Sequence, residues 1–281
     1  MSQKKEIKIE KNSPLSQEIK RIIENITKEY GEGTITTLGE SKFKDQPTLS
    51  TGSFILDQEI GGGYPFGRIV EIYGENASGK TTLALHAHAQ NIGVNINELL
   101  VLRPKYGEQA FQLLIEFIRG GAGLIVIDSV APLIPIELLG NWERPPIGAH
   151  AKMLNNGLSQ INNEMTNKET IIIFINQIRN KVSTGFFIGN PKTTTGGVAL
   201  TYYASLRIEL KNKKEKIEKE GEYVGIKVWF RIEKNRSISS RPASKESKEK
   251  PIEMMFKGGV QEEREMVDLA TELNVLQKSG N

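Results

Sequence analysis

The sequence predicts an α/β fold in which a mostly parallel sheet is covered by helices, preceded by a separate N-terminal helix. Short, unbroken apolar runs at 67–74, 123–130 and 170–179 have the length and composition of buried strands. Segments that read as helices, such as 107–121 and 152–167, alternate with them. Apolar strands separated by helices are typical of a parallel sheet that is buried on both faces.

The first expected element is an amphipathic helix near the N-terminus. Ser13 and Pro14 are a helix cap and a first-turn proline, and Gly31 and Gly33 end the segment. The apolar residues of this helix form one stripe on a charged surface, namely Ile19, Ile22, Ile23 and Ile26. From the spacing alone, this stripe could pack on its own domain or on a neighbouring subunit.

The core elements follow in alternation. A glycine-rich loop after the first core strand leads into an apolar helix at 81–90, and 99–104 reads as the next strand. Two later strands, 202–210 and 223–235, flank a charged turn, which predicts a hairpin that extends the sheet. The polar stretch 236–250 predicts a loop.

Composition limits the classes of protein to consider. A chain of 281 residues with 38% hydrophobic and 25% charged residues is ordinary for a globular protein with one substantial domain. It has no cysteine, no apolar run long enough to span a bilayer and no apolar signal core, so we expect a cytoplasmic protein without a membrane partner. A net charge of +3 says little about nucleic acid, because what matters is where the charge gathers.

Residues 74–81, GENASGKT, match the pattern G-x-x-x-x-G-K-[ST] of a phosphate-binding loop. Gly74 and Gly79 let the backbone turn so that successive N–H groups, with a helix N-terminus behind them, converge on phosphate oxygens. Lys80 places a cation on the β- and γ-phosphates, and the Thr81 hydroxyl is a ligand for Mg²⁺. The residues expected to contact the nucleotide are Gly74, Glu75, Asn76, Ala77, Ser78, Gly79, Lys80, Thr81 and Thr82.

The ends of two later strands supply a second part of the predicted site. Asp128 ends an apolar strand at the sheet edge where a nucleotide-bound Mg²⁺ would lie, so Thr81 and Asp128 are the predicted metal ligands. Asn176, Gln177 and Arg179 follow another core strand and could reach the γ-phosphate. The glycine-, threonine- and asparagine-rich loop after them is a candidate switch that couples the phosphate state to a ligand.

Together these motifs resemble the bacterial RecA recombinase family. The similar segments are TGSFILDQEIGGGYPFGRIVEIYGENASGKTTLALHAHAQ, IVIDSVAPLIP, IFINQIRNK, GNPKTTTGG and YYASLRIEL, with the N-terminal helix and YGEGTITTLGE. The resemblance covers nearly the whole chain and implies a RecA-like P-loop NTPase core at 39–281 and an oligomerisation helix at 1–38 that docks on the next protomer. It also implies an ATP-dependent filament that binds single-stranded DNA and pairs it with double-stranded DNA, and an SOS-type repressor is a further possible partner.

The resemblance assigns roles to single residues. Lys80 and Gln177 would act in catalysis, Gln177 as the sensor of the γ-phosphate. Lys234 and Arg236 occupy the places of a basic pair that reaches a neighbour's ATP, where cations stabilise transition-state charge. Phe256 stands where the family places an aromatic ring against adenine.

Two loops, 138–148 and 180–197, are implied to bind DNA. Basic side chains there would neutralise phosphates, and an aromatic ring (Trp142, Phe186 or Phe187) would stack on bases or wedge between them. The residues expected to bind DNA are Arg144, Lys152, Arg179, Lys181, Phe187 and Lys192.

The sequence departs from the family's pattern directly after the first core helix. A strand ending in a catalytic glutamate, and the helix after it, have no counterpart here, so a unit of roughly twenty residues is missing or was lost through an artefact. The segment 99–104 could fill the vacated place beside the strand of Asp128, and Glu108 could then act as the base. Loss of a water-polarising group costs ~10²–10⁴-fold in rate, whereas phosphate binding would survive.

Smaller departures are Lys192 in place of an acidic residue, Thr201 in place of a lysine, and an end at LQKSGN before the family's C-terminal domain. The sequence therefore predicts a DNA-dependent ATPase and recombinase for homologous recombination and DNA repair, with ATP and Mg²⁺ as cofactors. The alternative is a degenerate member that binds nucleotide and DNA without efficient hydrolysis. A metabolic P-loop kinase is disfavoured, because nothing resembles a small-substrate lid.

Overall fold

The computed structural model describes residues 17–31, 34–35, 47–92, 99–140, 146, 148–166, 168–180, 192–236 and 250–277. The chain divides into two units, residues 1–45 and 46–281. In the first unit, helix α1 (Gln17–Tyr30) confirms the predicted N-terminal helix. Its stripe is not covered within the described part of that unit, since Ile19 and Ile22 are 42% and 51% exposed. No helix in the described ranges is long and apolar enough to cross a membrane.

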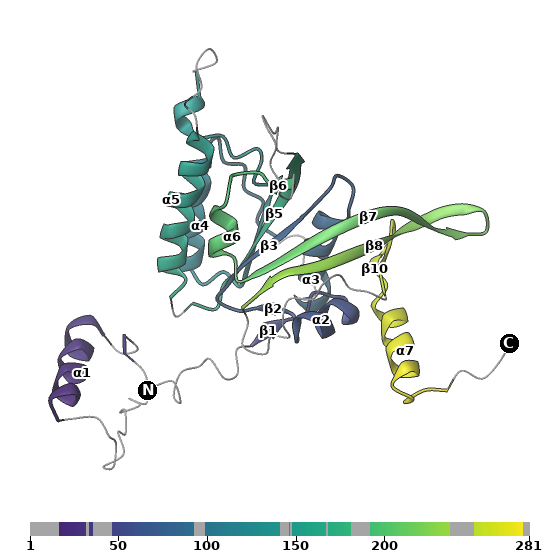
Figure 1. The fold of residues 1–281 in the computed structure, drawn as a ribbon, viewed down its shortest axis with the longest axis horizontal. Coiled ribbons are helices and arrows are strands. Elements are labelled where there is room, and N and C mark those ends of the chain that lie inside the picture. The colour runs from purple at the N-terminus through teal and green to yellow at the C-terminus, as the bar shows by residue number, and fades with distance from the viewer. Residues whose placement is uncertain are drawn as a thin grey trace, which may run out of the picture. The chain divides into compact units, whose positions relative to one another are not determined.

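The second unit contains the α/β core (Figure 1). In chain order its elements are β1 (Thr48–Leu49), α2 (Phe54–Ile60), β2 (Tyr64–Pro65), β3 (Ile69–Gly74), α3 (Lys80–Ile92), α4 (Gly107–Arg119), β4 (Leu124–Asp128), η2 (Ile136–Leu138), α5 (Ala149–Glu164), β5 (Ile171–Asn180), β6 (Lys192–Thr194), α6 (Ala199–Tyr203), β7 (Leu206–Lys219), β8 (Glu222–Asn235), β9 (Ile252–Met255), β10 (Gly259–Val260) and α7 (Glu262–Glu272).

The main sheet has the strand order β10-β9-β8-β7-β3-β5-β4. Its central strands β7, β3, β5 and β4 are parallel, which confirms the predicted α/β class. Strands β8, β9 and β10 extend this parallel block in antiparallel fashion, and β6 pairs with the end of β5. The β7–β8 pair is the predicted hairpin, and it projects beyond the sheet as a long two-stranded arm (Figure 1).

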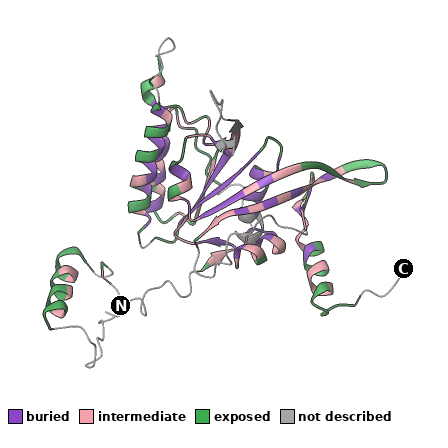
Figure 2. Ribbon diagram, in the orientation of Figure 1, coloured by how far each residue is buried: buried purple, intermediate pink, exposed green. Residues whose placement is uncertain are grey.

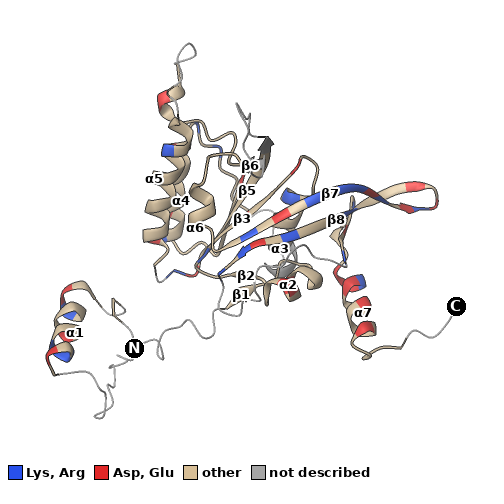
Figure 3. Cartoon of the chain, viewed as in Figure 1, with Lys and Arg blue, Asp and Glu red and all other residues tan. Residues whose placement is uncertain are grey.

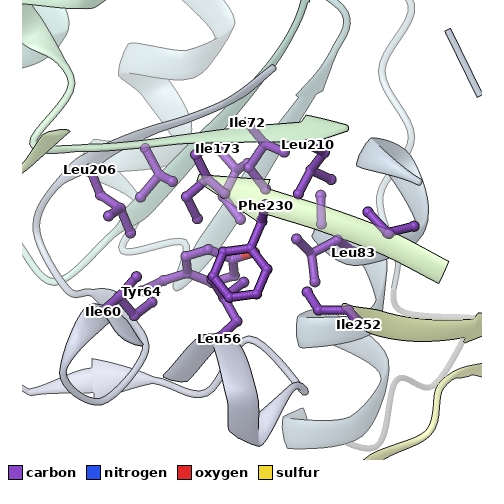
Figure 4. Packing of buried hydrophobic residues seen from close by; sticks show 14 of the residues in the cluster. Leu56, Ile60, Tyr64, Ile72, Leu83, Ile173, Leu206, Leu210, Phe230 and Ile252 are labelled. Atoms are coloured by element: carbon purple, nitrogen blue, oxygen red, sulfur yellow. The ribbon is translucent and has the colours of Figure 1, made fainter. Parts of the chain in front are cut away.

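Two apolar layers cover the two faces of the sheet. Because side chains alternate along a strand, Ile171, Ile173 and Ile175 of β5 enter the layer beneath α2 and α3. Ile172 and Phe174 enter the opposite layer, against α4, α5 and α6. Figure 4 shows the first layer, with side chains of α2, α3 and the sheet packed together. The inner strands are buried, whereas the outer half of the β7–β8 arm is exposed (Figure 2).

Three element predictions were wrong in detail. The segment 99–104 forms no strand, and its Leu100 and Val101 are 70% and 72% exposed, so β4 ends the sheet. An apolar run becomes a strand only where a neighbouring strand satisfies its backbone, and this run pairs with none of the described strands. The predicted strand at 202–210 begins only at Leu206, because Tyr202 and Tyr203 belong to α6. The charged stretch predicted as a turn continues β7 to Lys219.

Candidate functional site

The loop at 74–79 joins the end of β3 to the start of α3 at Lys80, as the motif predicts. Both glycines are required by the geometry. A Cβ on Gly74 would lie 2.2 Å from the carbonyl oxygen of Leu210. Gly79 has φ of +79°, and a Cβ there would lie 2.5 Å from Sδ of Met254 on β9. The loop is therefore packed closely against the sheet on both sides.

A residue of the β7–β8 hairpin stabilises the middle of the phosphate-binding loop, at Ala77. Ala77 has φ of 55°, a left-handed conformation that is uncommon for a residue with a Cβ. Nδ2 of Asn212, on β7, donates a 2.9 Å hydrogen bond to the Ala77 carbonyl. Sequence reasoning missed Asn212 and Met254, because each acts on the loop from a strand far along the chain.

Lys80 lies inside the loop, with only 8% of the residue exposed. Its Nζ donates to the carbonyl oxygens of Gly74 and Glu75, at 3.2 and 2.6 Å, and to the Ser78 hydroxyl. Burial lowers the pKa of Lys80, and the charge of Asp128 acts in the opposite direction. The ammonium is thus held at the centre of a ring of oxygens, next to the N-terminus of a helix of 13 residues.

The first turn of α3 meets the end of β4. The hydroxyl of Thr81 donates a 2.7 Å hydrogen bond to Oδ2 of Asp128, and both residues are exposed. A hydroxyl and a carboxylate side by side are hard oxygen ligands of the kind Mg²⁺ takes together with substrate phosphates and water. These residues therefore fit a nucleotide-bound Mg²⁺. Within the described ranges, no three acidic or histidine side chains gather into a self-sufficient metal cage.

Gln177 stands beside the loop, because its backbone is in register with Gly74 across the β3–β5 pair. Asn176, the first of the two other residues predicted to reach the γ-phosphate, is fully buried, and its amide donates a hydrogen bond to Glu71 inside the sheet. The side chain of Arg179 lies outside the described residues. Of the three residues predicted to reach the γ-phosphate, Gln177 is therefore the one whose described position, beside the loop, is consistent with sensing that phosphate.

Lys234 lies on the opposite face of the sheet from α3. Its Nζ donates to the carbonyl oxygens of Thr201 and Tyr202 in α6, at 2.7 and 2.9 Å. Burial, followed by the charge of nearby Arg236, lowers the pKa of Lys234 to about 8. Arg236 is exposed. Lys234 and Arg236 therefore lie away from the phosphate-binding loop of their own chain. That they act on the ATP bound by a neighbouring protomer stays a prediction.

Phe256 is 65% exposed in the turn between β9 and β10. That turn lies beside α3, because Met254 packs on Gly79 and a Cβ on Gly259 would lie 2.7 Å from Nδ1 of His86. An exposed aromatic ring on this turn is available for stacking, although only the family resemblance suggested that role.

Most of the expected DNA-binding residues lie outside the described part. Arg144, Lys181 and Phe187 belong to undescribed segments, as do Trp142 and Phe186. Arg179 and Lys192 lie in β5 and β6, but their side chains are likewise not described. Lys152 is on α5, with 70% of its side chain exposed and its Nζ 3.7 Å from Glu137. Their DNA contacts stay predictions.

The β7–β8 arm carries many lysine, arginine and glutamate residues (Figure 3). Sequence analysis predicted part of this charged stretch to be a turn. Aromatic rings brace its lysines: Nζ of Lys213 lies 3.8 Å from the Trp229 ring centroid, and Nζ of Lys216 lies 4.0 Å from that of Tyr223. The indole N–H of Trp229 donates to Glu215 at 3.0 Å. These contacts keep the lysine stems ordered along the exposed arm.

The base that the sequence analysis expects to be missing would have stood beside β4, which ends the sheet among the described strands. Glu108, the suggested replacement, accepts a 2.9 Å hydrogen bond from the backbone N–H of Ile136 with Oε2. This contact ties the start of α4 to the segment after β4, and the backbone N–H of Gly107 reinforces it by donating to Ile134 at 2.8 Å. A role for Glu108 as a base stays untested.

Comparison with known proteins identifies the family. A sequence profile of the RecA N-terminal domain matches residues 17–91 and 86–261. The chain belongs to the RecA family. It is 38% identical to Protein RecA of Mycoplasma mycoides subsp. mycoides over 292 aligned positions, covering 94% of this chain and 82% of that protein. It is 37% identical to Protein RecA of Bacillus subtilis over 285 positions, covering 92% and 79%.

These RecA alignments also locate the departure from the family pattern. The two matched segments meet within 86–91, at the end of α3, where the strand–helix unit is expected to be missing. Both alignments are longer than the 281-residue chain although they omit part of it, so they contain gaps in this chain. Among the described strands, β4 is at the end of the sheet. The loss of a strand beside it stays a prediction.

Proposed function

We propose that this chain is an ATP- and Mg²⁺-dependent recombinase that assembles as a filament on single-stranded DNA and pairs it with a homologous duplex. Membership of the RecA family supports the class of activity. The observation that carries the nucleotide part is the convergence of Lys80, Thr81 and Asp128 at one end of the parallel sheet.

The chain's own residues divide the work at this site. The backbone N–H groups at the start of α3 and the Lys80 ammonium would bind the phosphates. Thr81 and Asp128 would hold the Mg²⁺, which neutralises charge on the transferred phosphoryl group. Phe256 would stack on the base, and Gln177 would contact the γ-phosphate.

DNA and neighbouring protomers would use other surfaces. The loops at 138–148 and 180–197 would bind the DNA backbone through their lysine and arginine side chains, with Lys152 at the margin of the first loop. Lys234 and Arg236 would serve the nucleotide of a neighbouring copy, while the apolar stripe of α1 docks on the next protomer in the filament.

A second candidate is a filament protein that binds ATP and DNA but turns over slowly. Among the described strands, none beside β4 presents a carboxylate for an attacking water, and this observation favours slow hydrolysis. Loss of a positioned base costs ~10²–10⁴-fold in rate without weakening phosphate binding.

Steady-state ATP hydrolysis with and without single-stranded DNA separates the two candidates. Lys80→Ala is the blank, because it removes the cation without changing the sheet. DNA-stimulated turnover above the blank supports the active recombinase. Turnover at the level of the blank, with ATP-dependent DNA binding retained, supports the second candidate, and loss of both activities rejects the proposal.

A further inference from the structure

Glu71 is a charged residue in the middle of the apolar strand β3, and it is 0% exposed. A carboxylate can be buried at acceptable cost only when both oxygens are paired. Oε2 of Glu71 accepts a 2.6 Å hydrogen bond from Nε of Arg207 on β7. Oε1 accepts a 2.9 Å hydrogen bond from Nδ2 of Asn176 on β5. The side chain therefore joins three adjacent strands of the sheet.

Both the nitrogen and the oxygen of the Asn176 side-chain amide form hydrogen bonds, and these bonds fix the orientation of the amide. Its Nδ2 donates to Glu71 and to the carbonyl oxygen of Thr195, at 2.9 and 3.0 Å. Its Oδ1 accepts from the backbone N–H of Gln177 at 2.8 Å. Because Glu71 and Thr195 offer only acceptors and Gln177 offers only a donor, a flipped amide would lose all three bonds.

Asn176 thereby fixes two backbone positions relative to each other. Gln177 lies on β5, three residues before the expected second DNA-binding loop at 180–197, and Thr195 lies inside that loop, directly after β6. The N–H of Thr195 also donates to the Gln177 carbonyl at 3.2 Å. Gln177 is in register with Gly74, the first residue of the phosphate loop, and Glu71 lies three residues before Gly74 on the same strand.

The other end of the network reaches β8. Nη1 of Arg207 lies 3.9 Å from Oε2 of Glu233, and its guanidinium stacks 4.8 Å from the Tyr73 ring centroid. Arg207 is in register with Lys234, the expected interface cation. A pocket of about 360 Å³, lined by Thr194, Arg207, Glu233 and neighbouring residues, opens beside this end.

We infer that Glu71 is a positioning residue that couples the nucleotide site to DNA binding. It acts through Asn176, which holds Gln177 and Thr195 at a fixed distance from the phosphate loop. The inference rests on the proposed function, because coupling requires that the chain bind both ATP and DNA. A purely structural role for Glu71 predicts that its loss changes stability but leaves the effect of nucleotide on DNA affinity unchanged.

Glu71→Gln is the first test, because a glutamine offers one acceptor oxygen where two donors must be satisfied. The readout is the ratio of dissociation constants for a fluorescent single-stranded oligonucleotide with and without a non-hydrolysable ATP analogue and Mg²⁺. We expect a ratio of about tenfold or more in the wild type and a fall toward one in the variant. The affinity for the nucleotide analogue itself should change less than about threefold.

Glu209→Gln is the matched control, because it makes the same substitution on β7, at a carboxylate that contacts Lys211 and not Asn176. It should keep the wild-type ratio. If Glu71→Gln does not fold, Asn176→Ser replaces it, since this change removes the link to Thr195 and leaves the ion pair of Glu71 with Arg207. Melting temperature verifies folding in each case.

The outcomes separate the two levels of the inference. A wild-type ratio of one rejects coupled ATP and DNA binding, and with it both the proposed function and the role of Glu71. A wild-type ratio of about tenfold that persists in the folded variant rejects only the role of Glu71. Loss of the ratio in the variant, with Glu209→Gln unchanged and nucleotide affinity kept, supports it.

Discussion

The hydroxyl of Thr81 donates a 2.7 Å hydrogen bond to the carboxylate of Asp128, 47 residues along the chain. This contact brings the first turn of α3 to the end of β4 and places two hard oxygen ligands side by side. The position of β4 is therefore sufficient to place these two candidate metal ligands together, even though β4 is at the edge of the sheet among the described strands.

Asp128→Asn should weaken Mg²⁺-dependent nucleotide binding by about tenfold or more, because the amide keeps the shape of the side chain but loses its charge. Titration of a fluorescent ATP analogue with Mg²⁺ and with EDTA measures the effect. The variant and the wild type should agree in EDTA. Equal affinities in Mg²⁺ would show that Asp128 does not support the metal.

Gly79→Ala should destabilise the protein by about 1–2 kcal/mol, since φ of +79° is costly for a residue with a Cβ. It should also abolish tight nucleotide binding, because the loop backbone must shift. Gly221→Ala is the matched control, with φ of +80° at the hairpin turn and nothing within 4 Å of the added Cβ. Chemical denaturation should give a smaller loss for Gly221→Ala than for Gly79→Ala, because only the Cβ at 79 would also clash with Sδ of Met254. Unchanged nucleotide binding in Gly221→Ala would show that a positive-φ alanine does not weaken binding wherever it is placed.

Glu265→Gln should remove a pH dependence of stability between about pH 4.5 and 7. Glu265 is buried on α7 and accepts hydrogen bonds from the Ser53 hydroxyl and the Ile55 backbone N–H at the start of α2. Burial raises the pKa of Glu265 to about 7; the hydrogen bonds oppose this rise and the charge of Asp57 adds to it. Because the folded state holds the proton more tightly than the unfolded state, this group's contribution is largest below pH 4.5 and is lost as pH rises to about 7.

The variant should therefore gain stability relative to the wild type on going from pH 5 to pH 8, by an amount on the order of 2–3 kcal/mol. Urea denaturation at both pH values measures this difference. Glu263→Gln, an exposed carboxylate of the same helix, should show no such change. A pH-independent difference for Glu265→Gln would mean that the carboxylate titrates normally.

Val101→Lys should change the free energy of unfolding by less than about 0.5 kcal/mol, because Val101 is 72% exposed in a segment without regular structure. The same change at Val70, which is 0% exposed on β3, should prevent folding. Urea denaturation of both variants tests the placement of 99–104. A loss of several kcal/mol at Val101 would mean that the segment is buried, as the strand prediction had it.

The parts of the fold that sequence reasoning predicted are those with a local cause. The apolar runs around β3 and β5 and the glycines of the phosphate loop specify their own conformation. The placement of Lys80, Thr81 and Asp128 at one end of the sheet could therefore be predicted from the sequence. The segment 99–104 has the composition of a strand, but strand formation depends on a neighbour that the chain does not supply among its described strands.

The contacts that position the site depend on residues distant in sequence. Asn212 holds Ala77 from 135 residues away, and Arg207 neutralises Glu71 from 136 residues away. The one signal for the second contact was the presence of a glutamate inside the apolar strand IVEIYG, which requires a partner without indicating which one.

Homologous pairing tests the central claim most directly. A fluorescent single strand is incubated with the protein, ATP and Mg²⁺, and then with a duplex that either contains or lacks its sequence. The proposed function predicts joint molecules with the homologous duplex alone, and none with Lys80→Ala. Absence of joint molecules from the wild type, or equal yields with Lys80→Ala, would contradict it.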